Sequence, residues 1–245
     1  MTILTPAPAG VSVVIAVYQA ERFVAEALDA VLSQTRTPAE LILVDDGSTD
    51  GSRAVIDDFL ATHYRASPTI HVIAQANSGP SAARNTGFDA STQPLVAFHD
   101  ADDRALPTWL EVLAGVLDAQ PDVACALGTQ VVELEAGSSI PAWLADERVG
   151  DPLSGLPSRR YAQMCPVMRR TAIELAGPYD ETLMPGEDTD LLLRFIDAGL
   201  RVEYLDDVVL RRRVHPASLT QDAEAFRRAQ FGVLARRIRR KQAQR

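Results

Sequence analysis

The sequence predicts an α/β fold in which helices flank a mostly parallel central sheet. Nearly continuous apolar, β-prone runs recur along the first half, and segments with helical spacing separate them. Strands buried on both faces have such runs, and their alternation with helices is typical of parallel crossover connections. Polar groups also follow several runs directly, at the strand ends beyond which such sheets bind ligands.

Each element of the first half is predicted by its own pattern. VSVVIAVY reads as a buried strand, and the apolar residues after it recur at helical spacing. The same patterns predict strands at Val11 to Tyr18, Leu41 to Val44, Ile70 to Ala74, Leu95 to Asp100 and Val123 to Leu127. They predict helices at Glu21 to Ser33, from a cap at Ser48 or Thr49 to His63, after the turn Asn77 to Pro80, and from Pro107 onward.

The second half is less regular. Ala136 to Arg160 is rich in Gly, Ser and Pro and reads as a long loop over the rim. A strand at Met164 to Met168 and a helix at Thr171 to Ala176 are expected next. A further helix follows Gly186, with Gly199 as its stop. We expect one domain over residues 1–221 and a basic helical tail over 222–245.

Composition excludes several classes of protein. The chain has 245 residues, of which 47% are hydrophobic, and only Cys125 and Cys165 are cysteines. Two cysteines are too few for a disulfide framework and are not spaced as a zinc site. No signal peptide and no apolar stretch of about 18 residues is present. The sequence therefore predicts a cytoplasmic protein that does not span a membrane.

The charge is unevenly distributed along the chain. The net charge is −9, but residues 223–245 carry eight basic groups against Glu224, or +7, and residues 1–222 carry 16 basic and 32 acidic groups, or −16. An acidic body is a poor nucleic-acid binder. Lys241, in the tail, is the only lysine, which excludes a Walker-type phosphate loop and argues against a phospho-acceptor receiver domain.

A cluster of acids, Asp100, Asp102 and Asp103, ends the strand LVAFHDADD. If the chain stays extended there, Asp100 and Asp102 point the same way and can share one hard divalent cation. The alternative is a polar loop whose acids cap the next helix. Because Tyr18 and the pair Asp45 and Asp46 lie at neighbouring strand ends, convergence on one rim favours a functional site.

The helix after Gly186 begins with Glu187 and Asp188. Carboxylates are favourable at a helix N-terminus, so plain capping explains both residues taken alone. If the rim instead holds a nucleotide diphosphate on a metal, the metal neutralises the leaving group. Asp188 then serves as a base for an incoming hydroxyl, a division of roles that suits glycosyl transfer.

Six motifs in order resemble the family 2 glycosyltransferases. They are VSVVIAVYQAE, LILVDDGSTDGS, NSGPSAARNTG, VAFHDADD, GPYDETLMPGEDTDLLLRF and RRRVHPASLT, and together they span Val11 to Thr220. The resemblance implies the GT-A fold with its Rossmann-like sheet, a nucleotide-binding half at about 10–103 and an acceptor and catalytic half at about 104–221. Two positions depart from the family pattern, which has Pro where this chain has Ala16 and Asn where it has Gln19.

The resemblance also implies roles for individual residues. Asp188 is implied as the catalytic base, with Glu187 beside it. Asp46 is implied as the residue that contacts the nucleobase of the donor. The implied nucleotide-sugar-binding residues are Ala16, Val17, Tyr18, Glu21, Asp46, Arg84, Asn85, Asp100 and Ala101. Asp100 and Asp102 are implied as the DxD pair for Mn²⁺ or Mg²⁺, and the segment of Arg213, His215 and Ser218 as the element that closes on the metal or diphosphate.

The implied activity is inverting, metal-dependent transfer of one sugar from a UDP- or dTDP-sugar to the hydroxyl of a sugar or lipid-linked acceptor, in the synthesis of a polysaccharide, glycolipid or other glycoconjugate. The QxxRW element of processive synthases is absent. One alternative is an inactive nucleotide-binding relative. Another is a sugar-phosphate nucleotidyltransferase, which would want a basic, glycine-rich loop where this chain has YQAERF.

The basic tail has three interpretations. In FRRAQFGVLARRIRRKQAQR, helical spacing puts Phe226, Gln230, Leu234 and Ile238 on one face with arginines around them. Such a helix could lie on the anionic inner face of a membrane and bring the enzyme to a lipid-linked acceptor. It could instead dock on an acidic protein surface or remain a solvated terminus.

Overall fold

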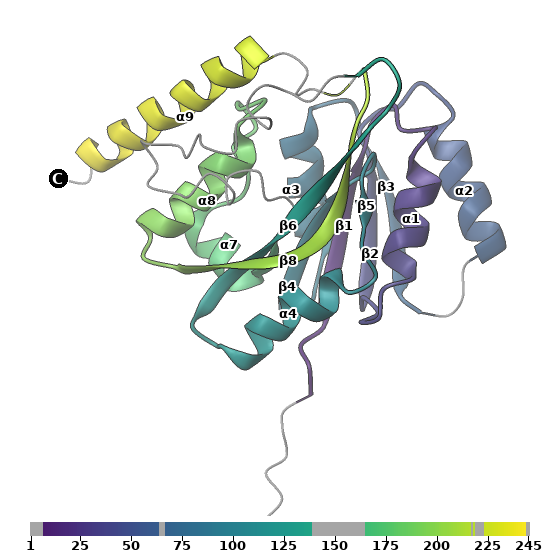
Figure 1. Ribbon diagram of the computed structural model, residues 1–245, viewed down its shortest axis with the longest axis horizontal. Coiled ribbons are helices and arrows are strands. Elements are labelled where there is room, and N and C mark those ends of the chain that lie inside the picture. The colour runs from purple at the N-terminus through teal and green to yellow at the C-terminus, as the bar shows by residue number, and fades with distance from the viewer. Residues whose placement is uncertain (1–6, 64–66, 139–164, 217, 219–222, 244–245) are drawn as a thin grey trace, which may run out of the picture.

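The computed structural model describes residues 7–63, 67–138, 165–216, 218 and 223–243, which form a central sheet flanked by helices (Figure 1). The described strands are β1 (Val11–Val17), β2 (Glu40–Asp45), β3 (Thr69–Ala74), β4 (Leu95–Asp100), β5 (Arg104–Ala105), β6 (Val123–Leu134), β7 (Val167–Arg169) and β8 (Arg201–Val214). The described helices are α1 (Val24–Leu32), α2 (Ser52–His63), α3 (Pro80–Ala90), α4 (Trp109–Ala119), α7 (Arg170–Ala176), α8 (Glu187–Asp197) and α9 (Ala223–Ala243).

The sheet has the strand order β3-β2-β1-β4-β7-β6-β8-β5. β1 is parallel to both β2 and β4, and β2 is parallel to β3. The register pairs Val17 with Asp45 and Ala16 with Asp100, so three strands end at the same rim. The chain winds outward in both directions from β1 and β4, and the crevice between their carboxyl ends is where such sheets bind ligands.

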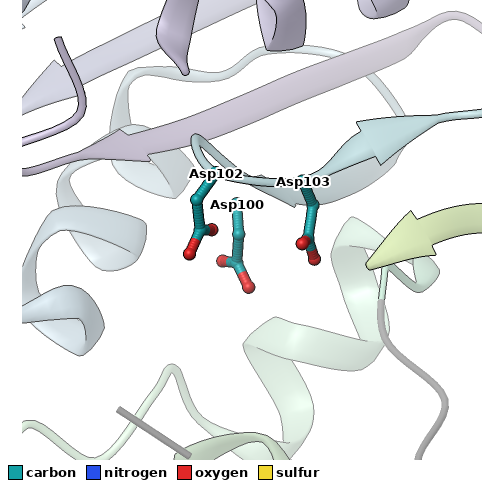
Figure 2. Close-up of side chains that lie close together, drawn as sticks. All are labelled: Asp100, Asp102 and Asp103. Carbon is teal, nitrogen blue, oxygen red and sulfur yellow. The ribbon is translucent and has the colours of Figure 1, made fainter. Parts of the chain in front are cut away.

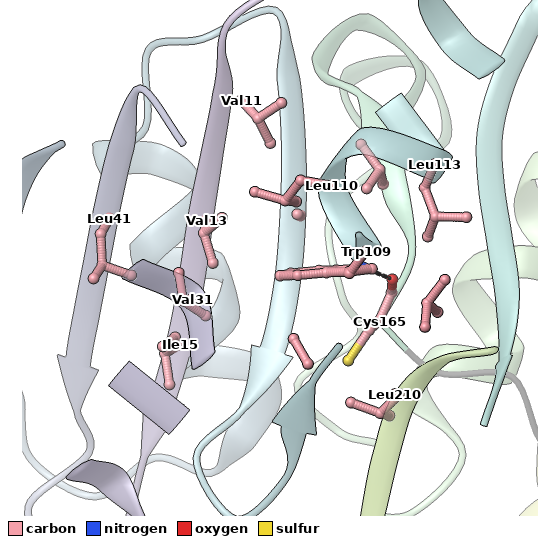
Figure 3. Packing of buried hydrophobic residues seen from close by; sticks show 14 of the residues in the cluster. Val11, Val13, Ile15, Val31, Leu41, Trp109, Leu110, Leu113, Cys165 and Leu210 are labelled. Carbon is pink, nitrogen blue, oxygen red and sulfur yellow. Dashed lines mark hydrogen bonds between the residues drawn. The ribbon is translucent and has the colours of Figure 1, made fainter. Parts of the chain in front are cut away.

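Two apolar cores cover the two faces of the sheet, because alternate residues of each strand point to opposite sides. Val13 and Ile15 pack with α1, α2 and α4, whereas Val14 packs with α3, α7 and α8. Trp109 at the start of α4 is completely buried, and its indole Nε1 donates a hydrogen bond to the Cys165 carbonyl at 2.8 Å (Figure 3). The first core thereby joins α4 to the segment that leads into β7.

Most predicted elements are present with shifted ends. α1 begins at Val24 rather than Glu21, and β7 begins at Val167, while Met164 lies outside the described residues. β6 runs to Leu134, well beyond the predicted end at Leu127. The sequence analysis missed β8, since RVEYLDDVVLRRRV is rich in charge and only partly buried. The predicted loop Ala136 to Arg160 lies outside the described residues from 139 onward.

The tail forms α9, which lies along α8 (Figure 1). Val233 is completely buried against the rest of the fold, whereas Gln230 and Leu234 of the predicted face are half-buried and Ile238 is 57% exposed. The side chain of Phe226 lies outside the described part. No helix among the described residues is long and apolar enough to cross a membrane.

Candidate active site

The loop after β1 forms the first wall of the rim. Tyr18 is 53% exposed there, next to buried Val17 and half-buried Ala16. Gln19 adopts a left-handed φ of 51°, and its Oε1 accepts a hydrogen bond from the Thr49 N–H at 2.8 Å. The exposed Glu21 likewise accepts one from the Gly51 N–H at 3.0 Å. These contacts tie the loop after β1 to the loop after β2.

Asp46 follows β2 and is only 2% exposed. Its carboxylate accepts hydrogen bonds from Gln75 Nε2 at 2.8 Å, from the Ser78 N–H at 2.9 Å and from the Gly79 N–H at 2.8 Å. Asp46 therefore orders the loop that leads into α3. Its contact with a nucleotide base stays a prediction, and neighbouring Asp45, also buried, accepts a hydrogen bond from the Ser48 N–H.

The acid cluster at the end of β4 is compact. Carboxylate oxygens of Asp100, Asp102 and Asp103 all lie within 4.8 Å of one another (Figure 2). The predicted extended chain after Asp100 was wrong as the reason for this proximity. Residues 101 and 102 form a turn, and the Asp103 N–H donates to the Asp100 carbonyl at 3.2 Å. The turn, with Ala101 buried beneath it, brings a third acid to the predicted pair. Three close carboxylates suit a hard divalent cation.

Nearby cations compensate the negative charge of the cluster only in part. Burial and then repulsion from Asp102 and Asp100 raise the pKa of Asp103 well above its usual range. Burial also raises the pKa of Asp100, but the charge and hydrogen bond of Arg84, together with the charges of His99 and Arg212, outweigh it and lower the net pKa. A cation at this cluster would relieve the repulsion between its members.

Arg84, from α3, joins the acid cluster to α8. Its side chain is almost completely buried, with Nη2 at 2.8 Å from Asp100 Oδ1 and Nη1 at 3.0 Å from Glu187 Oε1. Burial lowers the pKa of Arg84, but the negative charges of Asp188, Asp100, Tyr179 and Glu187 together outweigh it, and the pKa is raised well above the usual value. Arg84 is thus a permanent cation between two acidic segments that lie far apart in sequence.

Asp188 lies in the first turn of α8. Burial raises its pKa from 3.8 to about 6, against a lowering by Arg84 and by hydrogen bonding from Tyr179, while Glu187 and Asp100 raise it further. The carboxyl lines a small pocket whose other walls are mainly apolar, formed by Leu127, Pro166, Met168, Tyr179, Leu191 and Leu192. A carboxylate with such a raised pKa is suited to accept a proton near neutral pH.

The segment after β8 covers the acid cluster. His215 is buried with Nε2 at 3.2 Å from Asp102 Oδ2, and Ser218 Oγ accepts a hydrogen bond from the His215 N–H at 3.0 Å. The Arg213 N–H donates to Asp103 at 2.8 Å, but its guanidinium pairs with Glu26 of α1. The structure therefore brings His215 and only the backbone of Arg213 to the cluster.

Asn85 does not face the cluster. Its amide exchanges two hydrogen bonds with the backbone of Tyr179, at 2.9 and 3.0 Å, and donates a third to Glu181. Tyr179 itself, buried beside Arg84 and Asp188, was missed by the sequence analysis. It lies in an irregular segment before α8, and no periodicity or spacing in the sequence distinguishes it.

Comparison with known proteins shows the family to which the chain belongs. The model of glycosyl transferase family 2 matches residues 12–172. The glycosyltransferase EpsJ of Bacillus subtilis is 29% identical over 220 residues, which are 86% of this chain and 63% of that protein. The pre-mycofactocin glycosyltransferase of Mycobacterium tuberculosis is 35% identical over 172 residues, 67% of this chain and 35% of its own. The chain thus spans less than two thirds of these relatives.

Solved structures share the fold. A mannosyltransferase from Pyrobaculum calidifontis, solved with GDP-Man and Mn²⁺, has a TM-score of 0.73 and 20% identity over 96% of this chain and 66% of that one. Glucosyl-3-phosphoglycerate synthase from Mycobacterium tuberculosis was solved with Mn²⁺, UDP and phosphoglyceric acid. It has a TM-score of 0.67 and 18% identity, and the match covers 95% of this chain and 80% of that one. These likenesses confirm the expected GT-A fold. With the family model matching most of its length, the chain belongs to glycosyl transferase family 2.

Proposed function

We propose that this glycosyltransferase is an inverting, metal-dependent enzyme that moves one sugar from a UDP- or dTDP-sugar to an acceptor hydroxyl. One observation carries the proposal: Arg84 links the acid cluster of Asp100, Asp102 and Asp103 to the start of α8, where Asp188 has a raised pKa. A donor held at the cluster would thus lie near a carboxylate able to accept a proton.

The acid cluster fits a divalent cation such as Mn²⁺ or Mg²⁺. Its three carboxylates approach within 4.8 Å, and their repulsion contributes to the raised pKa of Asp103. Asp100, Asp102 and Asp103 would hold the ion, with His215 supporting Asp102. When bound, the ion supplies positive charge that stabilises the nucleoside diphosphate as it leaves.

The residues of the chain divide the remaining work. Asp188 takes the proton of the acceptor hydroxyl, whose oxygen forms a bond to the anomeric carbon as the bond from that carbon to the diphosphate oxygen breaks. Attack from the face opposite the leaving group inverts the anomeric configuration. Arg84 keeps Asp100 and Glu187 in place, and Tyr18 on the rim is exposed for contact with the nucleoside.

The test is calorimetric titration with UDP, dTDP and GDP, each with and without Mn²⁺. We expect metal-dependent binding of UDP or dTDP. Binding of GDP alone would correct the donor, a result made worth checking by the GDP-Man in the Pyrobaculum structure. If the folded protein binds no nucleotide with any metal, the enzymatic proposal is wrong and the inactive relative is favoured.

A lipid-linked acceptor is supported by the outer face of α9. Phe231 and Ile238 are 63% and 57% exposed, and the exposed Arg227 and Arg228 lie one helical turn before Phe231. An apolar stripe among cations suits an anionic membrane surface. We expect the wild type to sediment with vesicles containing phosphatidylserine. The double variant Phe231→Ser with Ile238→Ser should no longer sediment with them, while its nucleotide binding persists. Unchanged sedimentation would remove the membrane from the proposal.

A further inference from the structure

α9 lies directly against the backbone that begins α8. Gly186, the residue before the helix, has a left-handed φ of 112°, and a Cβ there would lie 3.0 Å from Val233 Cγ2. Val233 also packs with Leu183, from the segment before α8, and with Leu193 of α8. The inner face of α9 therefore contacts the chain two residues before Asp188.

A buried ion pair fixes the same two helices together. The carboxylate of Asp190 is completely buried and pairs with Arg194 Nε of its own helix and with Arg240 Nη1 of α9, each at 2.8 Å. A buried carboxylate that loses one of its cations is left undercompensated. Arg240 is therefore a specific partner of α8, although it lies 50 residues along the chain.

The same contacts extend to the segment that carries Tyr179. Arg194, held by Asp190, donates to the carbonyls of Ala176, Gly177 and Pro178 at 2.6–2.7 Å. From α9, Arg236 Nη1 donates to Asp180 at 2.7 Å and to Thr182 at 2.9 Å. Tyr179 lies between these anchored points, and its hydrogen bonding lowers the pKa of Asp188.

We propose that α9 is a brace that positions the catalytic base, with Arg240 as a positioning residue acting through Asp190. The inference rests on the proposed role of Asp188. α9 contacts α8 at Asp190, the residue before it at Gly186, and the preceding segment at Asp180. None of its described contacts reaches the acid cluster. Loosening it should misplace the base while the donor site remains intact.

The experiment compares Arg240→Ala with Arg239→Ala. Arg239 is a matched control, because it is the adjacent cation of α9 and, within the described part of the chain, its only hydrogen bond goes to the carbonyl of Ala235 in its own helix. We expect Arg240→Ala to lower kcat by roughly 10- to 100-fold, as a small misplacement of a catalytic group does, with unchanged affinity for the nucleoside diphosphate and Mn²⁺. Arg240→Lys should restore part of the loss, and Arg239→Ala should match the wild type.

Hydrogen exchange provides a readout that needs no activity. Arg240→Ala should speed amide exchange at residues 177–191, and Arg239→Ala should not. Equal exchange and equal kcat in both variants would overturn the brace. If the wild type binds no nucleotide while Arg240→Ala still speeds exchange at residues 177–191, the proposed function is refuted, and α9 is left as a support of α8 with no catalytic base to position. Faster exchange without a change in kcat would reduce Arg240 to a structural role and refute its role in positioning.

Discussion

Arg84 shows what a single residue does at this site. Its two guanidinium nitrogens reach Asp100 at the end of β4 and Glu187 at the start of α8, so one buried cation joins two acidic segments. Removing one partner of a buried ion pair costs several kcal/mol, on the order of 3–5, because the other charge is left uncompensated. The roles of the acids around it can therefore be separated only by substitutions that keep Arg84 in place.

Asp188→Asn should abolish transfer and keep donor binding. The amide has nearly the same shape but cannot accept the proton, so we expect kcat to fall by about 10²- to 10⁴-fold. Asp102→Asn, at the acid cluster, should instead weaken metal-dependent binding of the donor. Steady-state kinetics and calorimetry on the two variants check this separation of roles. Equal loss of donor affinity in both would contradict it.

The rate should depend on pH through Asp188. Its pKa is raised to about 6, mainly by burial, and the base acts only when it is deprotonated. The rate should therefore be constant above that pH and fall about tenfold per unit below it, while a bound cation nearby shifts this limb to lower pH. A pH profile of kcat checks the limb, and a rate that stays flat down to pH 4 would exclude Asp188 as the base.

The raised pKa of Asp188 also affects the pH dependence of folding stability. The effect has the opposite sign to that of an aspartate whose pKa is lowered by folding. Because the pKa of Asp188 is higher in the folded chain than its ordinary value of 3.8, the folded state binds more protons between these values. This carboxyl therefore favours folding at low pH, and its contribution is lost as the pH rises through about 6. A carboxyl in this half-buried position therefore costs stability at the neutral pH where the proposed base would work.

At the scale of elements, α3 places Arg84 by lying unusually close to the sheet. A Cβ at Gly87, one turn after Arg84, would lie 2.3 Å from Val14 Cγ1 of β1. No other residue fits there without moving the helix away from the strand. The short approach brings the Arg84 guanidinium to Asp100, the residue at the end of the neighbouring strand β4.

Gly87→Ala should therefore destabilise the protein by about 1–3 kcal/mol, because overpacking a buried contact forces the backbone to shift. Gly115→Ala is the matched control: it is also inside a helix, α4, but apart from its own helix backbone and chain neighbours no atom of the described residues lies within 4 Å of the added methyl group. Alanine there should stabilise the protein by up to about 1 kcal/mol through helix propensity. Urea unfolding measures the free energy of unfolding of both variants. Equal effects would show that Val14 can move aside at little cost.

At the scale of the whole molecule, one sheet separates two cores and carries the site on its rim. The core toward α1, α2 and α4 fixes the first strands, and the core toward α3, α7 and α8 holds Arg84 and Asp188 in relation to each other. α9 adds a small third cluster around Val233. The acid cluster thus depends on elements from both faces and from both halves of the chain.

If the proposed function is right, Mn²⁺ with UDP should raise the unfolding temperature, because both would bind the folded chain through groups that unfolding separates. At a ligand concentration 100 times Kd, the free energy of unfolding should rise by about 2.7 kcal/mol. Asp102→Asn should lose the part of this gain that depends on the metal and keep its own unfolding temperature without ligand close to that of the wild type. Differential scanning calorimetry with and without each component checks both statements, and a metal-independent gain would argue against the cluster as the ion site.

The sequence alone determined the first half of the fold and the position of its rim. Period and composition are local, so the runs at β1, β2 and β4 and the acids after them could be recognised directly. The ordered motifs likewise predicted the family that the comparison confirmed. Ends were less certain, as at α1, because a helix and the turn before it share the same apolar spacing.

Only the tertiary structure decided the contacts between distant segments. β8 carries too many charges to read as a strand, and it forms because β6 supplies a partner for its backbone. Likewise, no spacing could show that Arg84 meets Glu187, that Tyr179 lies beside Asp188, or that Arg240 neutralises Asp190. Such pairings depend on how helices pack across the sheet, and a sequence pattern reports only which face of each helix is apolar.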